Sequence, residues 1–309
     1  MSYEGEMLVN LGMPTKAQVE TSILTALLRY RGVLKEFASG EPIVDELADE
    51  FSLNQAQRSA TLERIYRKEN RTVHSLLWHR LLFRAADALA KSELVSRPTS
   101  TFQLSGKREW MLTEKGLDEV LRLNGLQNID KENLGVKSFE VQKIVKKITH
   151  KPRPTIYDPI ETEKRLVQKS SESYYRGRGF RQAVIEAYDC KCSFCGLKLT
   201  SPDSLLWEVE AAHIVPNTMR GKDDVWNGLA LCRVHHWAFD VGWLTLSDQF
   251  IVKVSKQIES LPASHGLIGT HDLIRMFLKN RKQIILPTEK NLYPHEAALN
   301  WHRQNRFAG

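Results

Sequence analysis

Two short stretches, Cys192-Ser-Phe-Cys195 and Cys232-Arg-Val-His235, enclose the most informative part of this 309-residue chain. The first offers two thiolates on a tight turn, and the second offers a thiolate and an imidazole further along the chain. Two such pairs supply the four soft or borderline ligands that a tetrahedral structural Zn²⁺ takes. We therefore predict a zinc site made of Cys192, Cys195, Cys232 and His235, against the alternatives of unrelated buried thiols or a redox pair. Cys190 could replace Cys192, but a Cys-x-Cys spacing fits one turn less well.

A second group of polar residues begins between these two pairs. His213 lies in the run Leu206-Trp-Glu-Val-Glu-Ala-Ala-His-Ile-Val-Pro216, whose apolar content is typical of a strand. After a loop, Asn227 directly precedes another apolar run. Asp223 and Asp224 stand just before it, and we expect them to cap the turn or helix there. Taken singly, His213 would be interpreted as a core histidine and Asn227 as a turn residue. Only their combination indicates a site.

The same group continues after the second pair. His236 directly follows the zinc-ligand candidate His235, and Asp240 is four residues beyond His236. On a helix, side chains four residues apart project from one face. Asp240 alone would be a surface charge, but next to His236 it forms a pair that could hold a cation.

The order and spacing of His213, Asn227, His236 and Asp240 are similar to those of HNH endonucleases. The segments Glu-Ala-Ala-His-Ile-Val-Pro, Asn-Gly-Leu-Ala-Leu-Cys and His-His-Trp-Ala-Phe-Asp resemble a bacterial branch of that family that is often fused to DNA-reading domains. The likeness extends back to Gly179 and forward to Phe307. It implies a zinc-stabilised ββα-metal fold in which two strands and a helix carry the site.

The resemblance also implies roles for these residues in phosphodiester hydrolysis. An imidazole with an ordinary pKa near ~6.5 suits a general base at neutral pH, and this role falls to His213. His236 and Asp240 would hold one divalent ion, Mg²⁺ or Mn²⁺, which neutralises charge on the phosphate. Asn227 would hold the His213 ring or its loop in orientation through its amide.

One position departs from the pattern of the family. Many relatives have a His or Asp immediately before the catalytic His as a further metal ligand, and that place is Ala212 here. Glu210 lies two residues earlier, on the same face of a strand. It could supply the missing carboxylate, or it could be an outward-facing surface residue.

The N-terminal part has helical periodicity followed by turn residues. Apolar positions predict helices over 15–30, around 43–48 and over 73–89, while 96–112 alternates and contains turn signals. Three helices followed by a two-stranded hairpin are the outline of a winged helix. Residues 114–123 again have helical periodicity.

Part of this region resembles a known module. Pro-Thr before the first helix, Trp78 in the third, Ala90-Lys-Ser-Glu-Leu-Val95 and Glu109-Trp-Met-Leu-Thr-Glu-Lys-Gly116 resemble the winged helix of Mrr-type restriction proteins, a module also found in proteins acting on modified DNA. Trp78 and Trp110 are more typical of core residues than of base-reading ones. The candidates for phosphate contact in DNA are Arg67, Lys68, Arg71, Lys107 and Arg108 here, with Arg220 and Lys222 in the loop after His213.

Charge is concentrated between these two regions. Residues 141–182 carry six Lys and five Arg against four Asp and Glu, whereas the whole chain has a net charge of +7. Such a block indicates a polyanionic partner or a solvated linker. We predict a winged-helix DNA-binding domain over 1–125, a basic linker over 126–173, helical around 141–148, and an HNH nuclease domain over 174–309.

These patterns lead to one functional prediction. We expect an α+β, cytoplasmic, restriction-type DNA endonuclease with no membrane segment. The Mrr likeness implies dependence on methylated adenine or cytosine in double-stranded DNA, and HNH chemistry implies 5′-phosphate and 3′-hydroxyl ends. One site cuts one strand, so a double-strand break needs a homodimer or two visits. The alternatives are a nicking or homing-like nuclease and a DNA-binding regulator with a decayed nuclease domain.

Overall fold

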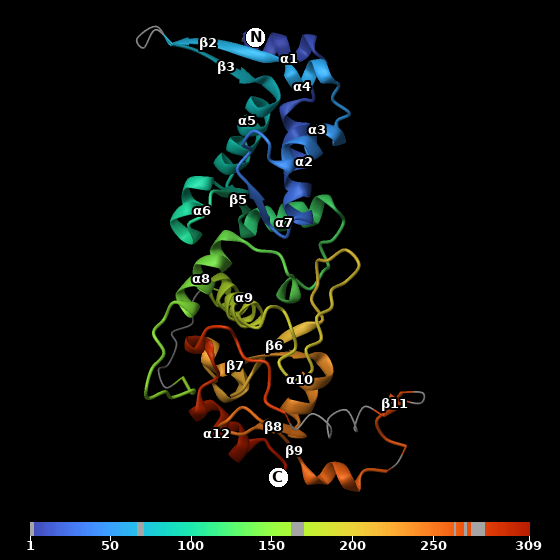
Figure 1. The fold of residues 1–309 in the computed structure, drawn as a ribbon, viewed down its shortest axis with the longest axis vertical. Coiled ribbons are helices and arrows are strands. Elements are labelled where there is room, and N and C mark those ends of the chain that lie inside the picture. Colours follow the sequence, from blue (N-terminus) through green and yellow to red (C-terminus); the bar gives the residue numbers. More distant parts are fainter. Residues whose placement is uncertain (1–2, 67–70, 162–169, 263, 269–270, 273–281) are drawn as a thin grey trace. The chain divides into compact units, whose positions relative to one another are not determined.

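The computed structural model describes residues 3–66, 71–161, 170–262, 264–268, 271–272 and 282–309. Its contacts divide the chain into two compact units (Figure 1). Unit 1 comprises 1–129 and 136–142, and unit 2 comprises 130–135 and 143–309. The segment expected as a linker, 126–173, is therefore shared between the two units. It contains α8 (Phe139–Thr149), which covers the predicted helical stretch.

Unit 1 is mostly helical. Its elements in chain order are α1 (Tyr3–Asn10), α2 (Lys16–Arg29), β1 (Val33–Lys35), α3 (Pro42–Glu50), α4 (Gln55–Ser59), β2 (Thr61–Tyr66), β3 (Arg71–Leu76), α5 (Leu77–Lys91), β4 (Val95–Ser96), α6 (Pro98–Ser105), β5 (Glu109–Leu112) and α7 (Glu114–Leu123). Thr15 and Gln18 form a capping box that starts α2 as the sequence predicts. The apolar face of α2 packs against α5. Trp78 and Trp110 are both buried in the core.

The prediction of a two-stranded hairpin over 96–112 is right for the antiparallel pairing of its ends, Val95 with Leu112 and Ser96 with Met111, but wrong for the segment between them. Helix α6 stands between β4 and β5, and β5 pairs with both β1 and β4 in a three-stranded sheet. Pro98 occupies the first turn of α6, and Gly106 ends it with a left-handed φ of 73°. The same Pro and Gly signals mark turns and helix ends, so the sequence pattern could not separate the two.

The third predicted helix begins later than expected. Residues 71–76 form β3, which pairs antiparallel with β2 over 61–66, and α5 begins only at Leu77. The β-branched residues Thr72 and Val73 suit a strand, and periodicity cannot separate a strand from a helix over so short a stretch. From Leu77 onward, the helical periodicity holds to Lys91.

Unit 2 is built around one antiparallel pair of strands and the helix that follows. Its described helices and strands are α9 (Ser170–Ala187), β6 (Val209–His213), β7 (Gly228–Cys232), α10 (Arg233–Asp240), β8 (Leu244–Leu246), β9 (Val252–Val254), β10 (Leu267–Ile268), β11 (His271–Asp272) and α12 (Glu296–Asn305). The pairing of β6 with β7 sets His213 opposite Gly228 and Glu210 opposite Leu231.

The strands β6 and β7 are packed against a helix in the core of unit 2. Helix α9 packs against both β6 and β7, with Phe180 and Val184 fully buried. A Cβ atom at Gly228 would come within 2.4 Å of the Val184 side chain, so glycine permits this close approach. The strand pair is therefore held by α9, which lies before it in the sequence, and α10 packs on the same two strands.

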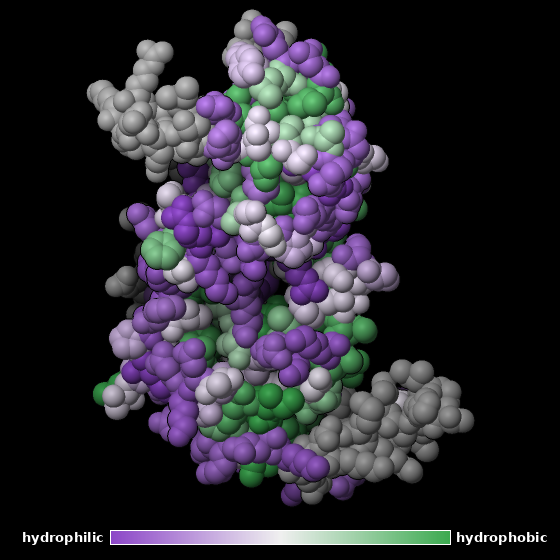
Figure 2. Space-filling model, turned by 45° about the horizontal axis from the view of Figure 1, so that its top comes forward, coloured by the Kyte–Doolittle hydropathy of each residue, from purple (hydrophilic) through white to green (hydrophobic). Residues whose placement is uncertain are grey.

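Hydrophilic residues cover most of the face drawn in Figure 2, with smaller hydrophobic patches between them. Within the described ranges, no helix combines the length and the apolar content that a membrane crossing requires.

Candidate active site and metal centre

The four predicted zinc ligands converge at the start of α10. The ligand atoms of Cys192, Cys195, Cys232 and His235 all lie within 4.8 Å of one another. The Cys195 and Cys232 sulfurs are 3.9 Å apart, and the Cys192 sulfur is 3.7 Å from Nδ1 of His235. Bond lengths of about 2.0 to 2.3 Å to a tetrahedral Zn²⁺ imply ligand separations of roughly 3.3 to 3.8 Å. The group therefore fits a structural zinc ion, and Cys190 is not part of it.

Hydrogen bonds within this cluster shift the pKa of its thiols in opposite directions, down at Cys192 and up at Cys232. Hydrogen bonds from the Cys195 and Cys232 thiols lower the pKa of the Cys192 thiol well below its ordinary value, although burial opposes this shift. A thiolate, and not a thiol, is the form that binds zinc. Cys192, Cys232 and His235 are buried, whereas Cys195 is exposed.

His213 ends β6 and is held on its ring face and at one nitrogen. The Phe180 ring stacks on the imidazole with the centroids 3.9 Å apart and the planes 19° apart. Nε2 of His213 lies 3.0 Å from Oδ1 of Asp223. The His213 side chain is 16% exposed, so it still reaches solvent.

Asn227 is fully buried and binds the loop that follows His213, not the His213 ring. Its Oδ1 accepts the Val215 N–H at 2.8 Å, and its Nδ2 donates to the carbonyls of Val215 and Lys222 at 3.0 Å each. Gly221 is needed beside it, because a Cβ there would meet the Val215 carbonyl oxygen at 1.7 Å. The sequence left open whether the Asn227 amide holds the His213 ring or the loop after it. In the structure it holds the loop.

His236 projects from α10 between two carboxylates. Its Nδ1 is 2.8 Å from Oε2 of Glu210, and its Nε2 is 3.4 Å from Oδ2 of Asp240. Glu210 also accepts from Nε of Arg233 at 3.2 Å. The hydrogen bond from His236 lowers the pKa of Glu210 below its ordinary value, although burial opposes this shift. Burial lowers the pKa of His236, but the hydrogen bond to Glu210 and the charges of Asp240 and Glu210 outweigh it and raise the pKa.

One pocket brings the two histidines together. It has a volume of about 280 Å³, and its lining includes His213, Glu210, His236, Asp240 and Arg181. One imidazole nitrogen and one carboxylate fit a divalent cation that keeps several of its waters, as Mg²⁺ does. Glu210 contacts Nδ1 of His236, so the other ring nitrogen, Nε2, is the one that faces Asp240. The residues of this pocket are therefore compatible with a general base and a cation site side by side.

Four residues in or beside the site were missed or misjudged from the sequence. The expected capping role is wrong for Asp223, which contacts His213. Asp224 does occupy the N-cap position of the short helix at Val225–Asn227, where its backbone carbonyl accepts the Asn227 N–H, but its side chain makes no capping bond. Phe180 and Arg181 come from α9, which precedes the zinc ligands. The sequence signals for them were the extension of the family likeness back to Gly179 and, for Arg181, its place in the basic block over 141–182.

The candidates for phosphate contact with DNA differ in their exposure and in their partners. Arg67 and Lys68 lie outside the described residues, and the side chain of Arg71 is not described either. Lys107 is exposed, while Arg108 forms an ion pair with Glu36. In unit 2, Arg220 is exposed, and Nζ of Lys222 donates to the Asp158 carbonyl at 2.7 Å.

Comparison with known proteins identifies part of unit 2. Residues 192–247 match the family model described as HNH endonuclease, and this range contains the four zinc ligands, His213, Asn227, His236 and Asp240. A solved structure titled modification dependent TagI restriction endonuclease is 19% identical, with a TM-score of 0.29. The match covers 48% of this chain and 43% of that one, and a TM-score this low establishes no shared fold. No curated protein matches the chain.

Proposed function

We propose, from the HNH endonuclease domain at residues 192–247, that this chain hydrolyses phosphodiester bonds in double-stranded DNA. The observation that carries the proposal is the pocket in which His213 lies beside His236 and Asp240. A general base and a cation site within one polar pocket are what hydrolysis of a phosphodiester requires.

The chain's own residues perform the proton and positioning steps. His213 removes a proton from a water molecule, whose oxygen attacks the phosphorus as the bond to the 3′ oxygen breaks. The departing 3′ oxygen takes a proton from solvent water, so the products are a 5′-phosphate and a 3′-hydroxyl. His236 and Asp240 would hold Mg²⁺ or Mn²⁺, which supplies positive charge to the scissile phosphate. Arg181 also lines the pocket and adds a fixed positive charge there.

The zinc cluster has a structural role in this proposal. It joins the segment before β6 to the start of α10, so the strand pair and the helix are tied at one end. A closed set of four protein ligands leaves no position for water or substrate. The proposed catalytic cation and the zinc ion therefore act at different places.

We further propose that cleavage depends on a modified base and that unit 1 recognises it. The support for this step is the sequence likeness of residues 12–125 to the N-terminal module of Mrr-type proteins; in the structure, helix α6 occupies the segment predicted as the wing. Because one HNH site cuts one strand, a double-strand break would need two copies of the chain or two successive cuts.

A His213→Ala variant tests the nuclease proposal. Cleavage of DNA in Mg²⁺ or Mn²⁺ should fall by about 10² to 10⁴-fold, because the variant lacks the general base. DNA binding in a gel-shift assay should be retained, because the substitution removes no cationic contact. Absence of cleavage by the parent protein in either ion would instead favour a DNA-binding regulator.

A further inference from the structure

The environment of His213 assigns its two ring nitrogens to different tasks. We propose that Asp223 is a positioning residue that keeps a hydrogen on Nε2 of His213 and leaves Nδ1 as the base. This inference rests on the proposed nuclease function and names the carboxylate that prepares its general base. From the sequence, Asp223 was expected only to cap the turn or helix before Asn227.

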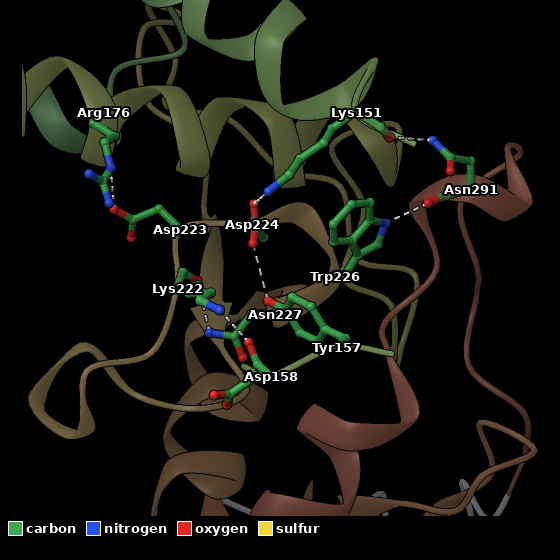
Figure 3. A network of polar contacts seen from close by, with 10 residues as sticks. All are labelled: Lys151, Tyr157, Asp158, Arg176, Lys222, Asp223, Asp224, Trp226, Asn227 and Asn291. Carbon is green, nitrogen blue, oxygen red and sulfur yellow. Dashed lines mark hydrogen bonds and ion pairs between the residues drawn. The ribbon is translucent and has the colours of Figure 1, made fainter. Parts of the chain in front are cut away.

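The two oxygens of the Asp223 carboxylate contact a histidine and an arginine. Oδ1 lies 3.0 Å from Nε2 of His213, and Oδ2 accepts from Nε of Arg176 at 3.2 Å. Figure 3 shows the Arg176 guanidinium pointing at this carboxylate from α9. The Asp223 side chain is only 11% exposed, so little water competes for these bonds. Arg176 thus holds Asp223 in the orientation that faces His213.

The hydrogen bond defines the tautomer of the ring. An ionised carboxylate only accepts hydrogen bonds, so the imidazole nitrogen facing it must carry the hydrogen. In neutral imidazole the other nitrogen then has the lone pair, and here that nitrogen is Nδ1. The stacked Phe180 ring restricts rotation of the imidazole out of this arrangement. Once Nδ1 has taken a proton from water, the nearby carboxylate stabilises the imidazolium ion that forms.

Asn227 cannot perform this task in the structure described. Both ends of its amide bond the backbone of the loop, at Val215 and Lys222. The loop from Val215 to Lys222 leads directly to Asp223, so Asn227 acts one step earlier by shaping the segment that presents the carboxylate. The two residues therefore have separable effects on the site.

The next residue supplies a matched control. Asp224 is also an aspartate of low exposure, but it bonds Nζ of Lys151 at 3.0 Å and the Tyr157 hydroxyl at 3.5 Å (Figure 3). The Asp224→Asn change removes the same charge from the same loop without touching His213. Any effect common to both variants reports on the loop, and any excess in the Asp223 variant reports on the imidazole.

The experiment compares Asp223→Asn, Asp223→Glu and Asp224→Asn in the full chain. An amide at position 223 can donate to Nε2 and so permits the tautomer in which Nδ1 carries the hydrogen. The single-turnover cleavage rate at saturating DNA should fall at least about tenfold in Asp223→Asn. It should stay within about twofold in Asp224→Asn, and Asp223→Glu should recover part of the loss. DNA affinity should be unchanged in all three variants.

Nitrogen NMR of the chain labelled at histidine gives a second readout, with His213 assigned by its loss in His213→Ala. The parent protein should show the Nε2–H tautomer at His213, and Asp223→Asn should lose it. Equal rates in Asp223→Asn and Asp224→Asn, or an unchanged His213 tautomer in Asp223→Asn, would overturn the proposal. If the parent protein cuts no DNA, the nuclease proposal fails, whereas the spectra still decide whether Asp223 positions the ring.

Discussion

Cys190 and Cys192 stand two residues apart, yet only Cys192 points into the cluster with Cys195, Cys232 and His235. Cys190 has a left-handed φ of 57° at the end of the turn after α9. Since a metal site needs all of its ligands at once, exchange of one member removes most of the binding free energy. The pair of neighbouring cysteines therefore offers a direct comparison.

A Cys192→Ser variant should lose its bound zinc and unfold at lower temperature. Loss of a structural metal ranks among the changes that cost more than about 4 kcal/mol of stability. For a unit of this size that corresponds to a fall in Tm on the order of 10 °C. Elemental analysis and a thermal melt measure both effects. Cys190→Ser should keep its zinc, and zinc loss in that control would show that the ligand set is different.

From the sequence, Glu210 was a candidate for direct contact with the metal ion. In the structure its two oxygens bond His236 and Arg233, so its contact with a cation would be made through the His236 ring. Partners of metal-ligating histidines orient the ring and raise its basicity. Glu210 is accordingly best tested through the affinity for the cation.

The Glu210→Gln change should raise the Mn²⁺ concentration for half-maximal cleavage by about 10 to 100-fold. The substitution keeps the shape of the side chain but removes the charge that holds His236. A titration of cleavage rate with Mn²⁺ measures the effect. Glu208→Gln is the matched control, because Glu208 bonds the Arg233 backbone N–H and not His236. An unchanged Mn²⁺ requirement in Glu210→Gln would contradict this role.

Among the elements, the loop between β6 and β7 depends on one buried amide. Asn227 joins both ends of the loop through Val215 and Lys222, and the loop in turn carries Asp223. Backbone hydrogen bonds also hold the loop, among them the Gly221 N–H to the Pro216 carbonyl at 3.0 Å, but the Asn227 amide is the side chain that connects its two halves. A substitution at Asn227 should therefore disturb the loop while the pairing of β6 with β7 stays in place.

An Asn227→Ala variant should lose stability and cleavage together. The change leaves the buried Val215 N–H and two carbonyls without their partner, at about 1 to 3 kcal/mol for each unsatisfied group. Hydrogen exchange at the Val215 amide should become faster, and the cleavage rate should fall. Asn305→Ala, which removes only an exposed side-chain bond at the end of α12, serves as the control. Wild-type exchange at Val215 in Asn227→Ala would refute the account of the loop.

Helix α9 extends the site beyond the range matched by the HNH endonuclease family. Phe180 stacks on His213, Arg176 bonds Asp223, and Arg181 lines the pocket, yet all three precede residue 192. The helix also packs on both strands through Phe180 and Val184. We infer that the functional unit begins with α9 and not with the first zinc ligand.

For the molecule as a whole, dependence on base modification can be tested with one plasmid prepared from two hosts. DNA from a methylating host should be cut and DNA from a non-methylating host should resist, because unit 1 is proposed to bind the modified base. Gel electrophoresis after incubation with Mg²⁺ or Mn²⁺ measures the difference, and His213→Ala controls for contaminating nucleases. Equal cutting of both samples would remove the modification claim and leave the nuclease proposal intact.

Local chemistry made much of unit 2 predictable. A metal site depends on ligand type and on short spacings such as Cys-x-x-Cys and Cys-x-x-His, and both are visible in the order of residues. The i, i+4 relation of His236 and Asp240 follows from helix geometry in the same way. Each of these pairs lies within a few residues of sequence, so the order of the amino acids was sufficient to predict them.

Contacts between distant segments were not predictable in this way. The bond from Asp223 to His213 depends on how the loop closes, and the stacking of Phe180 depends on how α9 packs across the strands. In unit 1, Pro98 and Gly106 mark the ends of α6, although the same residues also suit a turn. Only packing chooses between such local alternatives, because the free energy that separates them comes from burial against residues remote in the chain.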